Sequence, residues 1–424
     1  VVIFMARPSK RRFELEIRQI NYIKKLLMID KIEDVDKAAL KRLKNNLKKI
    51  KDSRAKGKTK FKIWDIIICS ILAVLFGAQD WEDIRDFVDN HYDWLREFLL
   101  LTGGIPCAKT YERVFSIIDS RELEDILNDF IMSFNIKSNL EEDIINLYGR
   151  ISRGSSRQET AYQDKIKPLN VLNAYSNKYG VCLASEMIEE KSNEIPTVPE
   201  ILKRFKVKGN IITWDALNTQ VDNIKAVVEL EGDYVAPIKG NQSNFYTDLI
   251  DYFDEKKLET IKAGNCQSAY LGYYEKRGSK AIHYEYFQTT DVNWYFDKKK
   301  WKKLNSIGVV RKTINEGKET KVEKRYYISS LFCDINLFSN AIRNHWSVEN
   351  KLHWHLDFTF KQDNNTIANK MALMNLEIVN KFCLAILNKV KAFYNNISLK
   401  RIRKIISYNF EKSLVNLMCY LSLS

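Results

Sequence analysis

The chain has 424 residues and a formal net charge of +14, from 68 lysines and arginines against 54 aspartates and glutamates. Hydrophobic residues make up 45% of it, which is enough for a core and excludes a largely disordered protein. The longest uncharged apolar stretch, 66–78, falls short of the ~20 residues that span a bilayer. We expect no signal peptide, and Met5 would be a more natural start than Val1. Seven scattered cysteines, none spaced C-x-x-C, indicate a reducing cytoplasm and disfavour disulfides or a zinc ribbon.

The excess positive charge is unevenly placed along the chain. Residues 1–62 carry a net charge of +13, residues 63–150 a net charge of −10, and the remainder a net charge of +11. Much of that last excess lies in two segments, 298–325 and 381–412. Basic patches on an otherwise ordinary globular protein favour a polyanionic partner such as DNA, although any single lysine-rich run is also typical of a solvated surface.

The first 60 residues are expected to form a basic helical extension and a linker. Apolar residues recur there at three- and four-residue steps among lysines: Leu40, Leu43, Leu47 and Ile50. A basic amphipathic helix can lie along DNA, on an acidic membrane or on a partner protein. Packing against the acidic section that follows explains the pattern equally well.

Residues 61–139 are expected to form an all-helical domain. The stretch 63–76 is apolar nearly all round, which predicts a buried helix, and Gly77 ends it. The helical period continues through aromatic residues on either side of a break at 103–106. These aromatics are most simply explained as core residues.

The period changes in the next section, 140–415. Three strands are predicted first, over 144–148, 168–175 and 181–188. Helices and strands then alternate: helix 194–205, strand 210–214, helix 219–229, strand 234–238 and helix 241–253. A strand-rich section over about 269–330 precedes a helical end, with 416–424 as a tail. This order predicts an α/β protein with a mixed sheet, helices on its faces and a β-rich insertion.

Two acidic residues stand where carboxylates can serve chemistry. Asp215 follows an apolar strand at its carboxyl end, the edge at which open α/β sheets bind ligands, although turn formation alone also places aspartates there. Glu349 shares one helical face with Trp346 and His353. A partly buried acid on such a face needs a partner, which is either a metal ion or the neighbouring Arg343.

Three histidines, His345, His353 and His355, suggest zinc. Their spacing does not bring them to one helical face, and no cysteine accompanies them. Structural or substrate-contacting roles are therefore favoured for these histidines.

Short ordered blocks run through residues 61–415. They are Gly77-Ala-Gln-Asp-Trp-Glu-Asp-Ile84, Gly104-Ile-Pro106, Arg113-Val-Phe115, Glu190-Lys-Ser-Asn-Glu-Ile195, Thr213-Trp-Asp-Ala216, Lys239-Gly-Asn-Gln242, Arg325-Tyr-Tyr-Ile-Ser-Ser330, His345-Trp-Ser-Val-Glu-Asn350 and Leu352-His-Trp-His-Leu-Asp357. With these blocks the sequence resembles the DDE transposases of bacterial insertion sequences, in the H-repeat-associated subgroup that carries its own N-terminal associated domain. The basic extension lies outside the resemblance.

The resemblance implies an RNase H-like domain in which two aspartates and a glutamate hold two Mg²⁺ or Mn²⁺ ions. Asp215 matches the second aspartate and Glu349 the glutamate, so both are expected as catalytic residues and metal ligands. One ion would activate the attacking water or DNA 3′-hydroxyl, and the other would stabilise the leaving oxygen. The implied partners are double-stranded DNA, as terminal repeats and target, and a second copy of the chain. A nucleoid-associated protein without membrane contact is expected.

The first aspartate of the family pattern is missing from this chain. The pattern is an apolar strand followed by Asp-Gly-Lys, and here that position reads Tyr148-Gly149-Arg150. A neutral phenol with a pKa of ~10 is a poor magnesium ligand. Asp143 lies about 16 Å upstream and on the opposite face of the strand, so it is not a substitute. Glu159 and Asp164, on a polar loop, are remote alternatives.

Several other family-pattern residues are expected to contact DNA: Lys239, Asn241, Gln242, Arg150, His345 and Lys351. Three roles stay open for Lys239, Asn241, Gln242, Asn193 and Glu194: they hold DNA phosphate, orient the carboxylates, or cap the helices that begin at Glu194 and Asn241. Asp357 is either a supporting acid or a helix-stop residue. The favoured hypothesis is a transposase by descent that keeps DNA binding but has impaired metal-dependent cleavage and strand transfer. The alternatives are an active transposase with another ligand in the gap, and a non-catalytic DNA-binding protein that regulates or competes at element ends.

Overall fold

The computed structural model describes residues 35–55, 59–134, 143–158, 166–189, 192–264, 267–317, 319–348, 352–394, 397–408 and 410–423. Glu159, Asp164, Glu349 and Lys351 lie outside these ranges, as does most of the basic extension.

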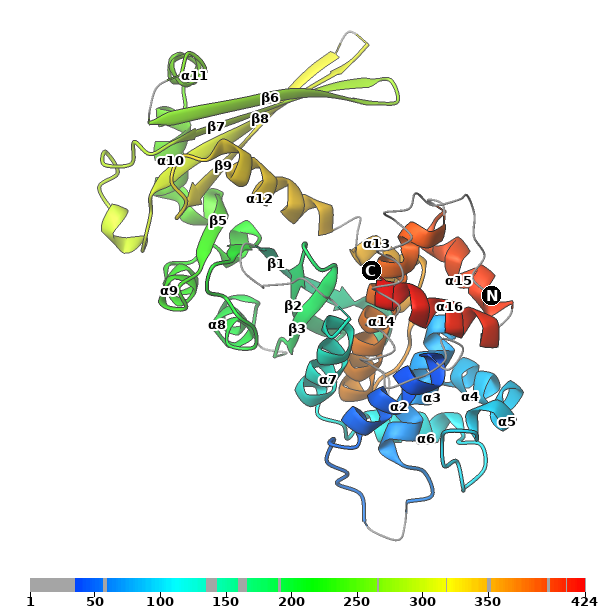
Figure 1. Ribbon diagram of the computed structural model, residues 1–424. Coiled ribbons are helices and arrows are strands. Elements are labelled where there is room, and N and C mark those ends of the chain that lie inside the picture. The colour runs from blue at the N-terminus through cyan, green and yellow to red at the C-terminus, as the bar shows by residue number, and fades with distance from the viewer. Residues whose placement is uncertain are drawn as a thin grey trace.

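One mixed sheet runs through the β-rich half of the molecule (Figure 1). Its strands within the described ranges are β1 (Ile144–Ser152), β2 (Leu169–Ser176), β3 (Val181–Met187), β4 (Ile211–Thr213), β5 (Asp233–Ile238), β6 (Ser268–Arg277), β7 (Lys280–Thr289), β8 (Ser306–Glu316) and β9 (Glu319–Ser329). They lie in the order β3-β2-β1-β4-β5-β9-β8-β7-β6. The pairs β1–β4 and β4–β5 are parallel and the other pairs are antiparallel.

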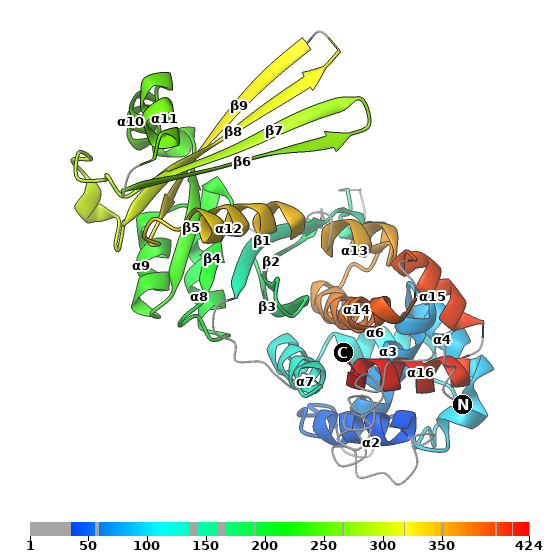
Figure 2. The ribbon, with the colours of Figure 1, turned by 45° about the horizontal axis from the view of Figure 1, so that its top comes forward.

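The section expected as a β-rich insertion continues this sheet. Strand β9 pairs with β5, with Val235 opposite Ser329, so β6 to β9 extend the central strands and do not form a separate unit. The two long hairpins, β6–β7 and β8–β9, project beyond the helices that cover the rest of the sheet (Figure 2).

Helices cover both faces of the sheet. On one face lie α8 (Val198–Leu202), α9 (Val221–Glu229), α10 (Ser243–Tyr252) and α11 (Glu255–Lys262). On the other face, α12 (Ile335–Val348) packs on β4, β5 and the bases of the hairpins, and α14 (Lys370–Val390) packs at the β2–β3 end. The predicted alternation of helices and strands is present, although α8 is shorter than the expected helix over 194–205.

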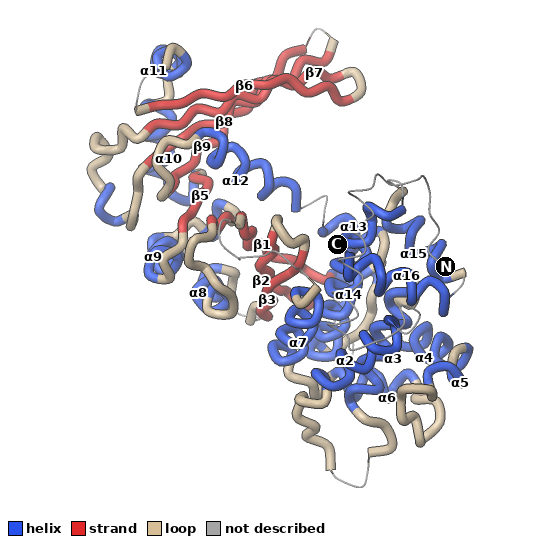
Figure 3. The backbone as a smooth tube through the Cα atoms, in the orientation of Figure 1, coloured by secondary structure: helices blue, strands red, loops and turns tan. Residues whose placement is uncertain are grey.

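The remaining helices gather at the other end of the molecule (Figure 3). They are α2 (Val35–Leu47), α3 (Ile63–Phe76), α4 (Trp81–Asn90), α5 (Tyr92–Leu95), α6 (Ala108–Phe115), α7 (Ser120–Met132), α13 (Trp354–Phe358), α15 (Leu399–Ser407) and α16 (Phe410–Leu423). Most of the segment expected as a C-terminal tail, 416–424, therefore belongs to a helix, because its apolar residues pack into the core, as Leu417 and Leu421 do.

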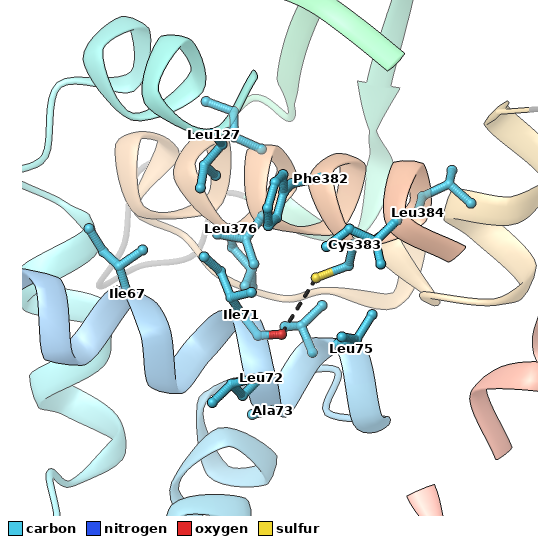
Figure 4. Close-up of a cluster of buried hydrophobic side chains, with 14 of the residues drawn as sticks. Ile67, Ile71, Leu72, Ala73, Leu75, Leu127, Leu376, Phe382, Cys383 and Leu384 are labelled. Atoms are coloured by element: carbon cyan, nitrogen blue, oxygen red, sulfur yellow. Dashed lines mark hydrogen bonds between the residues drawn. The ribbon is translucent and has the colours of Figure 1, made fainter. Parts of the chain in front are cut away.

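A single apolar core joins the N-terminal and C-terminal helices. Figure 4 shows α3 lying against α14, with Ile67, Ile71 and Leu75 facing Leu376 and Cys383. The Cys383 thiol donates to the Ile71 carbonyl oxygen at 3.5 Å. By length and composition α14 is the one single helix among the described residues that could cross a membrane, and α3 with α4 would do so only as a span bent by 94°. However, 89% of the apolar window of α14 is buried inside the protein, as in a core helix.

The basic helix α2 packs on the acidic helical section. Its apolar residues Leu40, Leu43 and Leu47 are buried in the shared core. The Lys44 ammonium donates to the Phe98 carbonyl oxygen and lies 3.7 Å from the Asp65 carboxylate. Of the alternatives that the sequence leaves open for this helix, the structure shows packing against the acidic section of the same chain.

Candidate active site

The parallel pairing of β1 with β4 brings Tyr148 and Asp215 to one place. In that pairing Asn146 stands opposite Thr213, and Tyr148 and Asp215 each come two residues later. Strand β4 ends at Thr213, so Asp215 lies just beyond the strand. Strand β1 continues to Ser152 because β2 pairs with it along its whole length, so Tyr148 lies inside a strand.

Asp215 is an open, charged residue that α12 holds from one side. Its side chain is 68% exposed, and its Oδ1 lies 3.4 Å from Nε2 of His345. The other ring nitrogen of His345 is 3.0 Å from the Thr213 hydroxyl. The hydrogen bond with His345 lowers the pKa of Asp215, and the charge of Lys239 adds to the effect. The carboxylate is therefore ionised at neutral pH.

Tyr148 is closed off from solvent. Only 5% of the residue is exposed, and it belongs to the apolar core beneath α14. Its ring meets the ring of His353 edge to face, with centroids 4.5 Å apart. Burial raises the pKa of the phenol well above its usual value, so the hydroxyl stays neutral. Burial, with help from the charge of Arg150, also lowers the pKa of His353 to about 4.

Arg150 is buried in a network of carboxylates. Its guanidinium, 7% exposed, donates to Asp357 and to Asp363 at 3.4 Å, and lies 3.6 Å from Glu377 on α14. These contacts fasten β1 to the segment after Glu349, and the expected contact of Arg150 with DNA stays a prediction. Its partners lie more than 200 residues later in the chain, so no local pattern identifies them. The same contacts give Asp357 an internal role.

The other acids near β1 have structural partners. Asp143 accepts a hydrogen bond from the Ser176 hydroxyl and another, of 3.0 Å, from the backbone of Lys178, at the far end of the strand. Glu194 accepts a 2.7 Å bond from the Asn218 amide and lies over Gly149, where a Cβ would come within 1.8 Å of its Oε1. Burial raises the pKa of Glu194, as does the charge of Asp215.

The family-pattern amides shape the loop after Asp215. The Asn241 amide donates to the Ala216 carbonyl at 2.7 Å, and the Gln242 amide donates to the Thr219 carbonyl at 3.1 Å. Asn193 accepts a 3.0 Å bond from the backbone of Ile195. Lys239, by contrast, lies beside Asp215 at the rim of a cleft.

This cleft, of about 450 Å³, opens beside Asp215. Strand ends and α12 line it with polar and aromatic side chains, among them Thr213, Lys239, Arg325, Tyr327, His345 and Trp346. Within the described ranges no group of three or more histidine, cysteine or acidic side chains could hold a metal ion. Helix α12 ends at Val348 and α13 begins after His353, so the helical turn expected to carry Glu349 lies outside the described residues.

Comparison with known proteins places the chain in a family. Residues 149–376 match the Transposase DDE domain, and residues 44–131 match the DDE_Tnp_1-associated domain. The chain belongs to the DDE transposase family.

Its relatives include two transposases of Escherichia coli. It is 30% identical over 383 residues to the H repeat-associated putative transposase YhhI of Escherichia coli K12, covering 89% of this chain and 98% of that protein. It is also 30% identical over 367 residues to the putative transposase YncI of Escherichia coli O157:H7, covering 85% and 90% respectively. A piggyBac transposase in a synaptic complex with hairpin DNA aligns with a TM-score of 0.33 at 11% identity over 94% of this chain and 81% of that one, which is too loose to carry an argument.

DDE transposases use divalent metal ions held by carboxylates. The described residues of this chain do not fit such a group. At the paired strand positions they offer one ionised carboxylate, on Asp215, and one neutral, buried phenol, on Tyr148.

Proposed function

We propose that this chain is a transposase of an insertion sequence that retains DNA binding and has impaired metal-dependent strand cleavage and transfer. The observation that carries the proposal is the register of β1 with β4, in which Asp215 and the buried phenol of Tyr148 each come two residues after the last pair, Asn146 and Thr213. Two carboxylates at these positions would give a divalent cation two negative charges, whereas Asp215 and Tyr148 give it one. Neutral oxygen of this kind is a weak ligand for magnesium, which prefers carboxylates and phosphate oxygens.

The topology supports an RNase H-like catalytic domain. Three antiparallel strands come first, and β4 and β5 then add in parallel beside β1, to give the order β3-β2-β1-β4-β5. Within this domain Asp215 and Glu349 are the proposed metal ligands, for two Mg²⁺ or Mn²⁺ ions. Bound ions would supply activation of the attacking oxygen and stabilisation of the leaving one.

The proposed partner is double-stranded DNA, both the ends of the element and its target. Lys239 beside the cleft is suited to a phosphate, and His345 keeps Asp215 ionised and oriented. We propose a homodimer on DNA, because the two ends of an element must be brought together for transposition.

Nicking of supercoiled plasmid DNA in Mg²⁺ or Mn²⁺ tests the proposal. The wild-type chain is expected to bind the plasmid without nicking it, and Tyr148→Asp is expected to nick it. Tyr148→Asn is the matched control, since it creates the same cavity and adds no charge. The double variant Tyr148→Asp/Glu349→Gln should lose the restored activity.

Two results would change the conclusion. If the wild-type chain nicks DNA and Glu349→Gln abolishes that activity, Tyr148 is not disabling. If Tyr148→Asp binds DNA, folds and still fails to nick, the chain is better described as a non-catalytic DNA-binding protein that competes at element ends.

A further inference from the structure

The four strands β6 to β9 carry cations on both faces of the sheet. The cations on one face form ion pairs with carboxylates, and those on the other face lie against aromatic rings. Neighbouring residues of a strand point to opposite sides of a sheet. Arg311 and Lys324 therefore lie on the side of α10 and α11, and their neighbours Lys312 and Arg325 lie on the side of α12.

On the α10–α11 side three cations share two carboxylates, Glu255 and Glu285. Arg311 binds Glu285 at 2.7 Å and Glu255 at 2.8 Å. Lys324 binds Glu255 at 2.8 Å, and Lys262 binds Glu285 at 3.1 Å. Burial alone would raise the pKa of Glu285, but the hydrogen bonds from Arg311 and Lys262 outweigh it and hold the pKa at about 2. Arg311, Lys324 and Lys262 are therefore each bound by a carboxylate of the protein itself.

On the α12 side three cations rest on aromatic rings. The Arg325 guanidinium lies 4.0 Å from the ring centroid of Trp346, and that of Arg343 lies 4.9 Å from the ring of Tyr273. The Lys312 ammonium lies 5.9 Å from the ring of Tyr284. A ring orients a cation without cancelling its charge, so each can still attract an anion.

Carboxylates on the same face offset these cations only in part. Glu275 attracts Arg343 and Lys312 over a longer range, and Glu323 attracts Lys312 and Arg325, but the closest partners of these two acids are other cations. Glu275 binds Arg277 at 2.9 Å, and Glu323 binds Lys321 at 2.7 Å. Glu323 also lies 3.9 Å from Arg325, a longer and weaker ion pair. For Lys312 and Arg343 no ion pair is found among the residues that the structure describes.

The aromatic–cation face, defined by Arg325, Lys312, Arg343 and their rings, leads directly into the cleft beside Asp215. Arg325 and Trp346 line that cleft together with Asp215 and His345, and so do Glu323 and Lys324, the neighbours of Arg325 on β9. Lys312 lies farther along β8, one of the strands of the projecting hairpins (Figure 2). A row of cations with excess positive charge beside a cleft suits a long polyanion.

We propose that the aromatic–cation face binds the phosphate backbone of duplex DNA that flanks the cleft, and that the opposite face of the same strands does not. The proposal rests on the proposed function and names the surface that holds its substrate. The planar forks of Arg325 and Arg343 suit phosphate oxygens, and phosphate contacts fix the register of a protein on DNA without reading its sequence.

Fluorescence anisotropy with a labelled random-sequence duplex tests this surface, with the full chain at several salt concentrations. The triple variant Arg325→Gln/Lys312→Gln/Arg343→Gln should bind at least ~10-fold more weakly at moderate salt. The slope of log affinity against log salt should become shallower by about 0.9 for each phosphate that the variant no longer neutralises. Lys262→Gln, on α11 and bound to Glu285 at 3.1 Å on the opposite side of the strands, is the matched control and should change affinity less than ~2-fold.

The outcomes separate this inference from the function on which it rests. If wild type binds duplex and the triple variant keeps its affinity and salt slope, the face is not the DNA surface although the chain binds DNA. If wild type binds no DNA at all, both the proposed function and this inference fail. An equal loss with Lys262→Gln would also contradict the assignment to one face. Arg325→Lys, which keeps the charge, should retain most of the binding and shows that the fold tolerates a change at this site.

Discussion

Two equivalent positions on the neighbouring parallel strands β1 and β4, each two residues past the last pair, have opposite character in this molecule. Beyond β4, Asp215 is ionised, largely exposed and held by His345 beside a cleft. At the equivalent position of β1, Tyr148 is buried against His353 under α14. Only one of the two positions bears charge, and the other belongs to the apolar core. The same sheet can therefore carry an open polar position and a closed apolar one on adjacent strands.

The largest difference between the two strand ends should appear in stability. Arg150→Met removes the cation beside Glu377, which is 2% exposed, and should cost about 3–5 kcal/mol of unfolding free energy because a buried charge keeps only the Ser152 hydroxyl as a partner. Lys239→Met, in the cleft beside Asp215, should lower the unfolding free energy by no more than about 0.5 kcal/mol. Urea denaturation followed by circular dichroism measures both. A loss below about 1 kcal/mol for Arg150→Met would mean that the closed end is not held by this network.

The buried site around Tyr148 and His353 should also make the stability of the protein sensitive to acid. The pKa of His353 falls from 6.5 to about 4 in the folded state, so between these values the unfolded chain takes up a proton that the folded chain refuses. The contribution of His353 to stability is complete above pH 6.5 and is lost as the pH falls toward 4, by as much as about 3 kcal/mol.

Urea denaturation at pH 7, 6, 5 and 4 measures this loss, and His353→Asn should flatten the dependence over that range. Equal pH dependence in wild type and His353→Asn would show that the ring beside Tyr148 is not kept neutral by burial.

Much of the fold could be predicted from the sequence, because its periodicity is strong. The first three strands, β4, β5 and the apolar helix α3 lie where their patterns indicate, since period-2 and fully apolar runs have few other solutions. The extent of β1 could not be predicted, because pairing with β2 and not local composition carries it to Ser152. The continuation of the sheet through β9 is likewise a long-range pairing, invisible in local sequence.

The candidate site could be predicted in part. The position of Asp215 beyond β4 follows from the Thr213-Trp-Asp pattern, and the substitution at Tyr148 is visible in the family motif. The ion pairs of Arg150 could not be predicted, because Asp357, Asp363 and Glu377 come from distant segments that only the fold assembles. The assignments of Glu349 and Lys351 stay predictions.

Metal affinity tests the central claim most directly, because it does not depend on the DNA end recognised. Electron paramagnetic resonance of free Mn²⁺ measures binding to wild type, Tyr148→Asp, Tyr148→Asn and Tyr148→Asp/Asp215→Asn, each first shown to be folded by its thermal unfolding. We expect Tyr148→Asp to bind Mn²⁺ at least ~10-fold more tightly than wild type or Tyr148→Asn, and Asp215→Asn to remove the gain. Wild-type binding as tight as that of Tyr148→Asp, and equally dependent on Asp215, would contradict the account.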